Sequence, residues 1–317
     1  MTRRELYRAA YLAAADFAGL RLWDELEPGE CFAVEAPGED YPAIVAVMGH
    51  EGQEYGLTLT TGENAYGAMR GIWDSADEDE DIMETIDLLS MSFEHFRNVP
   101  QDSRGFFEVA GFKQDPDGLV PLFMAKEAGR RLREMKRDEV KFMLYALRGI
   151  IAAHRKGILK PEPITRSDRV LTLMVRGDPK EPDVLTEWRT FEVGETPDPR
   201  KLSSPPDDFR DLARHDGHLL VSFHRAPISI ADEERTVWLV LVMDEDSEAL
   251  LCAETVLGGD VDEAAERLFG VLRGESKWAP AGIPAKISFT NRRLSTLVGS
   301  ALESLGIETE HIDRHEV

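Results

Sequence analysis

The last hundred residues constrain the fold more than any other stretch, because seven segments there have clear starts and stops. Apolar runs dense in β-branched and aromatic residues predict buried strands, and Thr236–Met243 is the clearest of them. Asp260 and Asn291 each stand where a helix N-cap is needed, ahead of apolar residues at helical spacing. The predicted elements are strands at 217–225, 235–243 and 249–257, a helix at 260–273, a strand at 285–289, a helix at 291–305 and a strand at 307–312. Their order is βββαβαβ.

The N-terminal half predicts an α+β domain. Apolar residues at helical spacing favour a helix over 3–20, which Gly19 ends. Three strand-like runs with hairpin-length connections then predict an antiparallel meander at 30–36, 42–48 and 55–60. Further predictions are a helix after Gly62, a short helix or strand at 86–96, a short strand at 105–112 and a long helix at 125–156 that kinks or restarts near Asp138.

Chain length favours two domains. The 317 residues exceed the roughly 250–300 at which a single core stops growing. Lys160–Ile164 holds two prolines, which forbid a continuing helix, so this segment is the expected linker. We therefore predict an N-terminal α+β domain at 1–160 and a C-terminal domain at 161–317. Alternating residues at 169–176 and 185–193 predict a hairpin that precedes the C-terminal sheet.

Charge limits the classes of partner. The chain has 37 basic and 60 acidic residues and a formal net charge of −23. This charge opposes binding to nucleic acid or to an anionic membrane, and it favours a protein partner with basic residues. No 18-residue apolar window or signal-type segment is present, so we expect a cytoplasmic protein. Cys31 and Cys252 lie in predicted strands and are expected to be reduced and buried. The sequence carries no signal for an oligomeric state.

The C-terminal element order resembles the ribonuclease H-like fold of retroviral-type integrases, transposases and Holliday-junction resolvases. A local likeness adds to it, since Lys286–Asn291 opens a helix that leads to Leu305–Ile307, as integrase-like sequences do after their second acidic residue. The resemblance covers about the last hundred residues and implies a layered sheet with helices after its third and fourth strands.

The chemistry of that superfamily needs carboxylates that hold two divalent ions, one on the first strand and one after the fourth. Here the first strand, His218–His224, contains no acid, and Thr290 and Asn291 stand at the other position. Acids do occur on the first helix, but they also fit a solvated face at a helix N-terminus. The resemblance therefore implies a degenerate module, and we expect no metal and no other cofactor.

A second resemblance covers most of the chain. Leu22–Trp23 leading into Cys31–Val34, followed by Val47–Gly49 and Glu54–Leu59, is similar to an uncharacterised family of bacterial two-domain proteins of unknown function. Pro284–Ile307 matches the pattern of the C-terminal module in that family. This likeness implies the two-part layout and assigns no catalytic residue.

The sequence contains few motifs that are typical of catalytic, nucleotide-binding or metal-binding sites. No GxSxG, HExxH, GxxxxGK[ST] or strand-linked GxGxxG pattern occurs. His215–His218 is interpreted as a turn, because no further ligand completes a tetrahedral metal site. His50 and Glu51 lie beside Tyr55 in a glycine-flanked loop between two predicted strands, which makes them a candidate binding loop.

Three hypotheses about function follow. The first is a non-catalytic binding or regulatory protein, which suits the missing acids and the absence of catalytic motifs. The second is a hydrolase or nuclease with a relocated carboxylate site, for which Asp244, Glu263, His224 and Asn291 are the candidate residues. The third is a nucleic-acid-binding pseudo-nuclease, for which Arg292–Arg293 and Arg130–Arg133 are the basic clusters.

Overall fold

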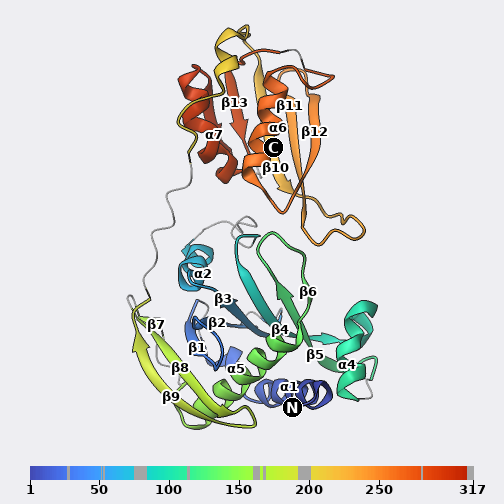
Figure 1. Cartoon of the computed structure of the whole chain (residues 1–317), viewed down its shortest axis with the longest axis vertical. Coiled ribbons are helices and arrows are strands. Elements are labelled where there is room, and N and C mark those ends of the chain that lie inside the picture. Colours follow the sequence, from blue (N-terminus) through green and yellow to red (C-terminus); the bar gives the residue numbers. More distant parts are fainter. Residues whose placement is uncertain are drawn as a thin grey trace. The chain divides into compact units, whose positions relative to one another are not determined.

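The chain forms two compact units, each with its own sheet (Figure 1). The computed structural model describes residues 1–26, 29–50, 52, 54–74, 84–112, 115–159, 165–166, 169–191, 201–279 and 281–312. The first unit comprises residues 1–82, 86–127 and 132–194, and the second comprises residues 83–85, 128–131 and 195–317. Both units combine helices with sheets, which confirms the predicted α+β class.

The first unit is built on a nine-stranded sheet. Its strands are β1 (Cys31–Glu35), β2 (Ala43–Met48), β3 (Gly56–Thr61), β4 (Asp87–His95), β5 (Leu119–Lys126), β6 (Arg133–Glu134), β7 (Thr165–Arg166), β8 (Arg169–Asp178) and β9 (Glu181–Arg189). They lie in the order β6-β5-β4-β3-β2-β1-β8-β7, with β9 also paired to β8. Strands β1 to β6 form an antiparallel meander that contains the three predicted hairpin strands.

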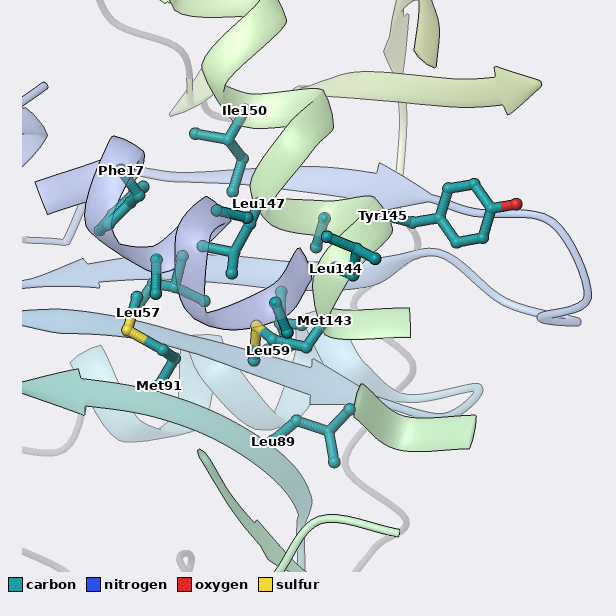
Figure 2. Packing of buried hydrophobic residues seen from close by; sticks show 14 of the residues in the cluster. Phe17, Leu57, Leu59, Leu89, Met91, Met143, Leu144, Tyr145, Leu147 and Ile150 are labelled. Atoms are coloured by element: carbon teal, nitrogen blue, oxygen red, sulfur yellow. The ribbon is translucent and has the colours of Figure 1, made fainter. Parts of the chain in front are cut away.

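Helices cover both faces of this sheet. Its helices are α1 (Arg3–Ala18), α2 (Ala65–Asp74), α4 (Gly105–Ala110) and α5 (Arg137–Arg155), with 3-10 turns η1 (Leu22–Asp24), η2 (Phe96–Asn98) and η3 (Gln101–Arg104). Helices α1 and α5 supply Phe17, Leu147 and Ile150, which pack on Leu57 and Met91 of the strands (Figure 2). On the opposite face, a smaller cluster joins α2 to β1, β2 and β8. Burial of apolar side chains from both faces is the main stabilising contribution in this unit.

Two predicted elements of the first unit were wrong. Residues 105–112, expected as a strand, begin with helix α4, because Phe106 stacks on Tyr7 of α1 with ring centroids 4.9 Å apart. Gly111 ends that helix with a φ of 75°, a conformation that glycine adopts without strain. The start of the predicted helix 125–156 instead completes β5 and forms β6, and α5 begins only at Arg137. The segment 86–96, left open between helix and strand, contains strand β4.

The hairpin at 169–189 belongs to the first sheet and not to the C-terminal domain where we expected it. Strand β8 pairs in parallel with β1, with Ala33 opposite Thr172. This long-range pairing places residues up to 194 in the first unit, so the division does not fall at 160. The predicted linker at 160–164 lies outside the described residues.

The second unit holds a five-stranded sheet in the order β12-β11-β10-β13-β14. Its elements are η4 (Asp207–Asp211), β10 (His218–Arg225), β11 (Val237–Asp244), β12 (Ala249–Leu257), α6 (Val261–Leu272), β13 (Lys286–Phe289), α7 (Arg292–Ser304) and β14 (Glu308–His311). Strand β11 is antiparallel to β10 and β12, whereas β13 is parallel to β10 and β14. From β10 onward, the predicted order βββαβαβ is confirmed.

Helices α6 and α7 pack on one face of this second sheet. Leu219, Val221 and Phe223 of β10 belong to the core cluster that contains residues of both helices. Phe223 and Trp238 are fully buried there, with ring centroids 4.8 Å apart. Because side chains alternate along a strand, the intervening residues of β10 point to the opposite face. Those residues are His218, Leu220, Ser222 and His224.

Two short segments from the N-terminal half complete the second unit. Glu84 Oε2 accepts a hydrogen bond of 3.0 Å from the Thr236 hydroxyl just before β11, and Glu84 is only 4% exposed. Arg130 forms an antiparallel bridge with Arg235, and its guanidinium pairs with Glu234 at 2.6 Å. The start of β11 is therefore held by residues more than a hundred positions earlier in the chain.

Candidate functional site

A chain of three polar side chains joins the ends of β10 and β13. Ser222 and His224 stand two residues apart on β10, so they share the face opposite the helices. Ser222 Oγ lies 2.9 Å from His224 Nδ1. The parallel pairing of Val221 with Phe289 brings Thr290 beside them, and the Thr290 hydroxyl donates to Ser222 Oγ at 3.1 Å. We call Ser222, His224 and Thr290 the hydroxyl–imidazole cluster.

The Ser222 hydroxyl is the centre of this cluster. It accepts the hydrogen bond from Thr290 and is also hydrogen-bonded to His224 Nδ1, where the tautomer of the imidazole decides which of the two atoms donates. All three side chains are half-buried. Neutral hydroxyl and imidazole groups can orient a polar ligand by hydrogen bonds, but they are weak ligands for Mg²⁺, which prefers carboxylate and phosphate oxygens.

Asn291, a candidate catalytic residue, serves as a helix cap. Its Oδ1 accepts a 2.9 Å hydrogen bond from the Leu294 backbone N–H in the first turn of α7. Its Nδ2 donates a 3.0 Å hydrogen bond to the Phe223 carbonyl on β10. The side chain is 2% exposed, so it fixes α7 to the end of β10 next to the hydroxyl–imidazole cluster.

The structure does not bring Asp244 and Glu263 together with His224. In the β10–β11 ladder Asp244 is opposite Leu219, whereas His224 is opposite Leu239 at the other end. Asp244 closes the β11–β12 turn, where hydrogen bonds from the Ser247 hydroxyl and backbone N–H lower its pKa. Glu263 lies in the first turn of α6, on the helix-covered side, and accepts a 2.9 Å bond from Arg267. The relocated carboxylate site therefore has no common location.

The candidate loop of the first unit is partly anchored. His50 is exposed in the connection between β2 and β3, and Glu51 lies outside the described residues. Tyr55 packs against Trp23, with ring centroids 5.0 Å apart. Gly49 has a φ of 119°, and a Cβ there would meet the Tyr55 ring at 2.6 Å, so glycine is required at this turn. Tyr55 thus holds the loop on Trp23, and ligand binding by the loop stays a prediction.

Among the described residues, neither the cysteines nor any group of metal-ligating side chains forms a further candidate site. Cys31 and Cys252 are free and buried, as predicted, and burial raises the pKa of the Cys31 thiol to about 11. Within the described part of the chain, no group of three or more His, Cys, Asp or Glu side chains could hold a metal ion. No helix among the described residues has the length and apolar character to cross a membrane.

Sequence reasoning recognised the individual residues of the hydroxyl–imidazole cluster but did not predict their contact. The spacing of Ser222 and His224 is a usable signal, because residues two apart on a strand share a face. The position of Thr290 depends on which strands pair in parallel, which no local pattern encodes. The role of Glu84 was missed because its partner Thr236 is 152 residues away.

Comparison with known proteins gives a family and no activity. No curated protein and no solved structure matches the chain. The family model described as "Domain of unknown function (DUF7309)" matches residues 7–175, which is more than half of the chain. This range includes most of the first unit and both short segments that complete the second. The chain therefore belongs to the DUF7309 family, which is defined by a domain of unknown function.

Proposed function

We propose that this chain is a non-catalytic binding or regulatory protein whose second unit is a degenerate ribonuclease H-like module. The order βββαβαβ supports the likeness to that fold. So does the parallel pairing of β10 with β13, the first and fourth strands of the module. Two-metal chemistry in that superfamily needs acids from these two strands to lie side by side, and the pairing makes the corresponding positions neighbours.

The observation that carries the proposal is the contact between Ser222 and Thr290. Their hydroxyl oxygens lie 3.1 Å apart, at the first-strand and post-fourth-strand positions where a family nuclease has carboxylates. Two neutral hydroxyls hydrogen-bonded to each other supply no negative charge to offset that of two divalent ions. The geometry of the module is thus compatible with that of a nuclease, whereas its donor set suits hydrogen bonding to a polar ligand.

A protein partner in the cytoplasm fits the remaining observations. The net charge of −23 favours a partner with basic residues, and two buried free thiols suit a reducing compartment. The alternative of nucleic-acid binding has less support, because arginines of the basic cluster at 130–133 are already paired with carboxylates of the protein itself. Arg130 pairs with Glu234, and Arg133 pairs with Glu127 and Glu139, so these guanidinium groups are already engaged.

The proposal is tested by placing acidic residues at positions 222 and 290. In the variant S222D/T290D, two carboxylates would face each other, and we expect Mn²⁺ to raise its unfolding temperature by several degrees, as binding to the folded state requires. The matched neutral variant S222N/T290N and the natural protein should show no such rise. The natural protein should also leave a panel of DNA, RNA and small phosphodiesters intact in Mg²⁺ or Mn²⁺.

Two results would contradict the proposal in different ways. Metal-dependent phosphodiester cleavage by the natural protein, lost in S222A/T290V, would make the second unit an enzyme. Failure of S222D/T290D to gain Mn²⁺ affinity while remaining folded would show that the two positions do not have the geometry of a two-metal site.

A further inference from the structure

Strand β12 is an edge of the second sheet, and part of its backbone is unpaired. Gly258, directly after the strand, donates from its N–H to the Thr236 carbonyl at 2.7 Å, on the side of β11. Antiparallel pairing alternates inward and outward backbone groups, so those of Ala253 and Thr255 point outward. Leu251 lies at a bulge, where this alternation is interrupted, and its carbonyl accepts a hydrogen bond from the Ser276 hydroxyl. Ala253 and Thr255 are exposed, and no described residue bonds to their outward groups.

Beyond a bulge between Leu250 and Cys252, the rest of this edge has few of the features that usually block strand addition. Natural edge strands are protected by charged side chains, by proline, by bulges or by being short. Strand β12 is nine residues long, contains no proline or lysine, and has Glu254 as its single charged residue. The opposite edge, β14, is four residues long and carries Glu308 and Glu310. Of the two edges, β12 is the one suited to pair with another chain.

A groove lies along α6 and reaches β12 at Glu254. Its volume is about 430 Å³, and apart from Glu254 it is lined by residues of α6 and of the segment directly after that helix, with Asp262, Glu263, Glu266 and Glu275 as further acids. Two of the lining residues mark its place beside the edge. Glu254 projects from β12 toward α6, where it pairs with Arg267 at 2.9 Å, and Ser276 contacts the carbonyl of Leu251. A strand added to β12 would direct every second side chain into this groove.

The groove favours positively charged side chains. Its lining contains five carboxylates and two guanidinium groups. Both guanidinium groups are already paired, Arg267 with Glu254 and Glu263, and Arg273 with Asp208 at 2.8 Å. The surplus of negative charge would therefore attract lysine or arginine side chains, whose ammonium and guanidinium groups complement carboxylates.

On the other face, an added strand would meet small and apolar residues. Ala253 pairs with Leu241 and Thr255 with Leu239, and these four side chains share the face away from the helices. Their neighbours on a new strand would pack against aliphatic surface, which suits valine, isoleucine or threonine. The two faces together specify a pattern of alternating basic and β-branched residues.

We infer that the β12 edge and its acidic groove dock an extended segment of a partner protein, in which basic residues alternate with β-branched ones. The segment adds to the sheet as a sixth strand. This inference rests on the proposed binding role and names the class of partner. A second copy of this chain is a poorer occupant, because its own β12 would bring Glu254 and further acids of α6 to an acidic groove.

The probe is a blocked nine-residue peptide of alternating lysine and valine, labelled for fluorescence anisotropy and titrated into the full chain. We expect saturable binding that weakens as salt rises, and slower amide hydrogen exchange at Ala253 and Thr255 when the peptide is bound. The same peptide with glutamate in place of lysine should not bind. In the protein, A253P/T255P removes the two outward N–H groups without removing inward hydrogen bonds, so affinity should fall at least about tenfold.

Charge variants separate docking from general attraction to an acidic protein. E254Q/E263Q/E266Q removes three groove carboxylates and should also weaken binding about tenfold or more, with a smaller salt dependence. The matched control E108Q/E181Q/D183N changes the net charge equally at exposed positions of the first unit and should bind as the natural protein does. If the proline variant does not fold, as judged by circular dichroism, this pair of triple variants decides the question.

Three outcomes would overturn the inference: absence of peptide binding, equal weakening by both triple variants, or self-association through β12 that the peptide does not compete with. None of them bears on phosphodiester turnover. Conversely, metal-dependent turnover would remove the proposed non-catalytic role and leave the peptide titration as a separate result.

Discussion

The two sheets of this protein differ in how many of their faces their own helices cover. In the first unit, α1 and α5 pack on one face and α2 packs on the other. In the second unit, the described helices α6 and α7 both pack on the same face. The first sheet therefore uses both faces for its own core. In the second sheet, the face opposite α6 and α7 carries the hydroxyl–imidazole cluster, and β12 forms one edge.

Hydroxyl groups in the two sheets show the same contrast. Thr60 and Thr172 of the first sheet are buried, and their hydroxyls have no hydrogen-bond partner among the described residues. They fill space much as valine would, at some cost in desolvation. In the second unit, Ser222 is hydrogen-bonded both to Thr290 and to His224. The isolated hydroxyls therefore act in packing alone, whereas the connected ones also fix the orientation of their neighbours.

The largest expected effect tests whether the two units are independent cores. Phe223 and Leu59 are each fully buried in a different unit. Phe223→Ala should lower the unfolding free energy of the second unit by about 3–5 kcal/mol, and Leu59→Ala that of the first by about 2–5 kcal/mol. Amide hydrogen exchange, read separately in each unit, measures both. If either variant speeds exchange equally in the two units, the units unfold as one cooperative body and do not have independent cores.

A smaller effect on stability is expected from the loss of the helix cap that Asn291 provides. Asn291→Ala removes the cap of α7 and the bond to the Phe223 carbonyl, so the second unit should lose about 1–2 kcal/mol of unfolding free energy. Asn291→Asp keeps the capping acceptor and should lose less. Chemical denaturation of both variants checks this order. A loss in Asn291→Asp as large as in Asn291→Ala would show that the bond to β10 matters more than the cap.

The smallest effect concerns pH and the first unit. Hydrogen bonds from Arg176 and then Arg189 lower the pKa of Glu35 below its usual 4.5, against the opposing effect of burial. Because the folded pKa is the lower one, Glu35 stabilises the fold above pH 4.5, and that stability is lost as pH falls through the folded pKa. Glu35→Gln should cost about 1 kcal/mol at pH 7 and progressively less below pH 4.5.

The control for this pH dependence is a carboxylate of the second sheet. Glu310 pairs with Lys286 at 2.7 Å on the surface, where solvent screens the interaction. Glu310→Gln should change the acid unfolding profile less than Glu35→Gln does. Unfolding curves measured from pH 3 to pH 7 for both variants make the comparison, and a larger change in Glu310→Gln would contradict the assignment of Glu35.

The order of helices and strands in the second unit could be predicted from the sequence, because local capping and turn residues mark the ends of its helices. Asp260 and Asn291 cap their helices with side-chain hydrogen bonds, and Gly306 takes a φ of 76° two residues after the end of α7. Each signal lies within three residues of the group it satisfies. The element order could therefore be predicted, whereas the contact of Thr290 with Ser222 depends on strand pairing between residues 68 apart.

The first unit was harder because distant contacts override its local patterns. Ala125 and Lys126, expected at the start of the long helix, instead end strand β5, because β4 pairs with that strand along its whole length. Residues 105–110 contain aromatic residues typical of strands, yet they form a helix against α1. Pairing of β8 with β1 joins residues almost 140 positions apart, which is why the division of the chain was misplaced.

The segments at 83–85 and 128–131 interleave the two units along the sequence, so neither unit is one continuous stretch of the chain. The backbone passes between the two units five times, at the borders 82/83, 85/86, 127/128, 131/132 and 194/195. Genetic recombination at any of the last four borders would separate the second sheet from Glu84, from Arg130 or from both. Transfer of residues 195–317 alone would therefore leave the start of β11 without two of the contacts that hold it.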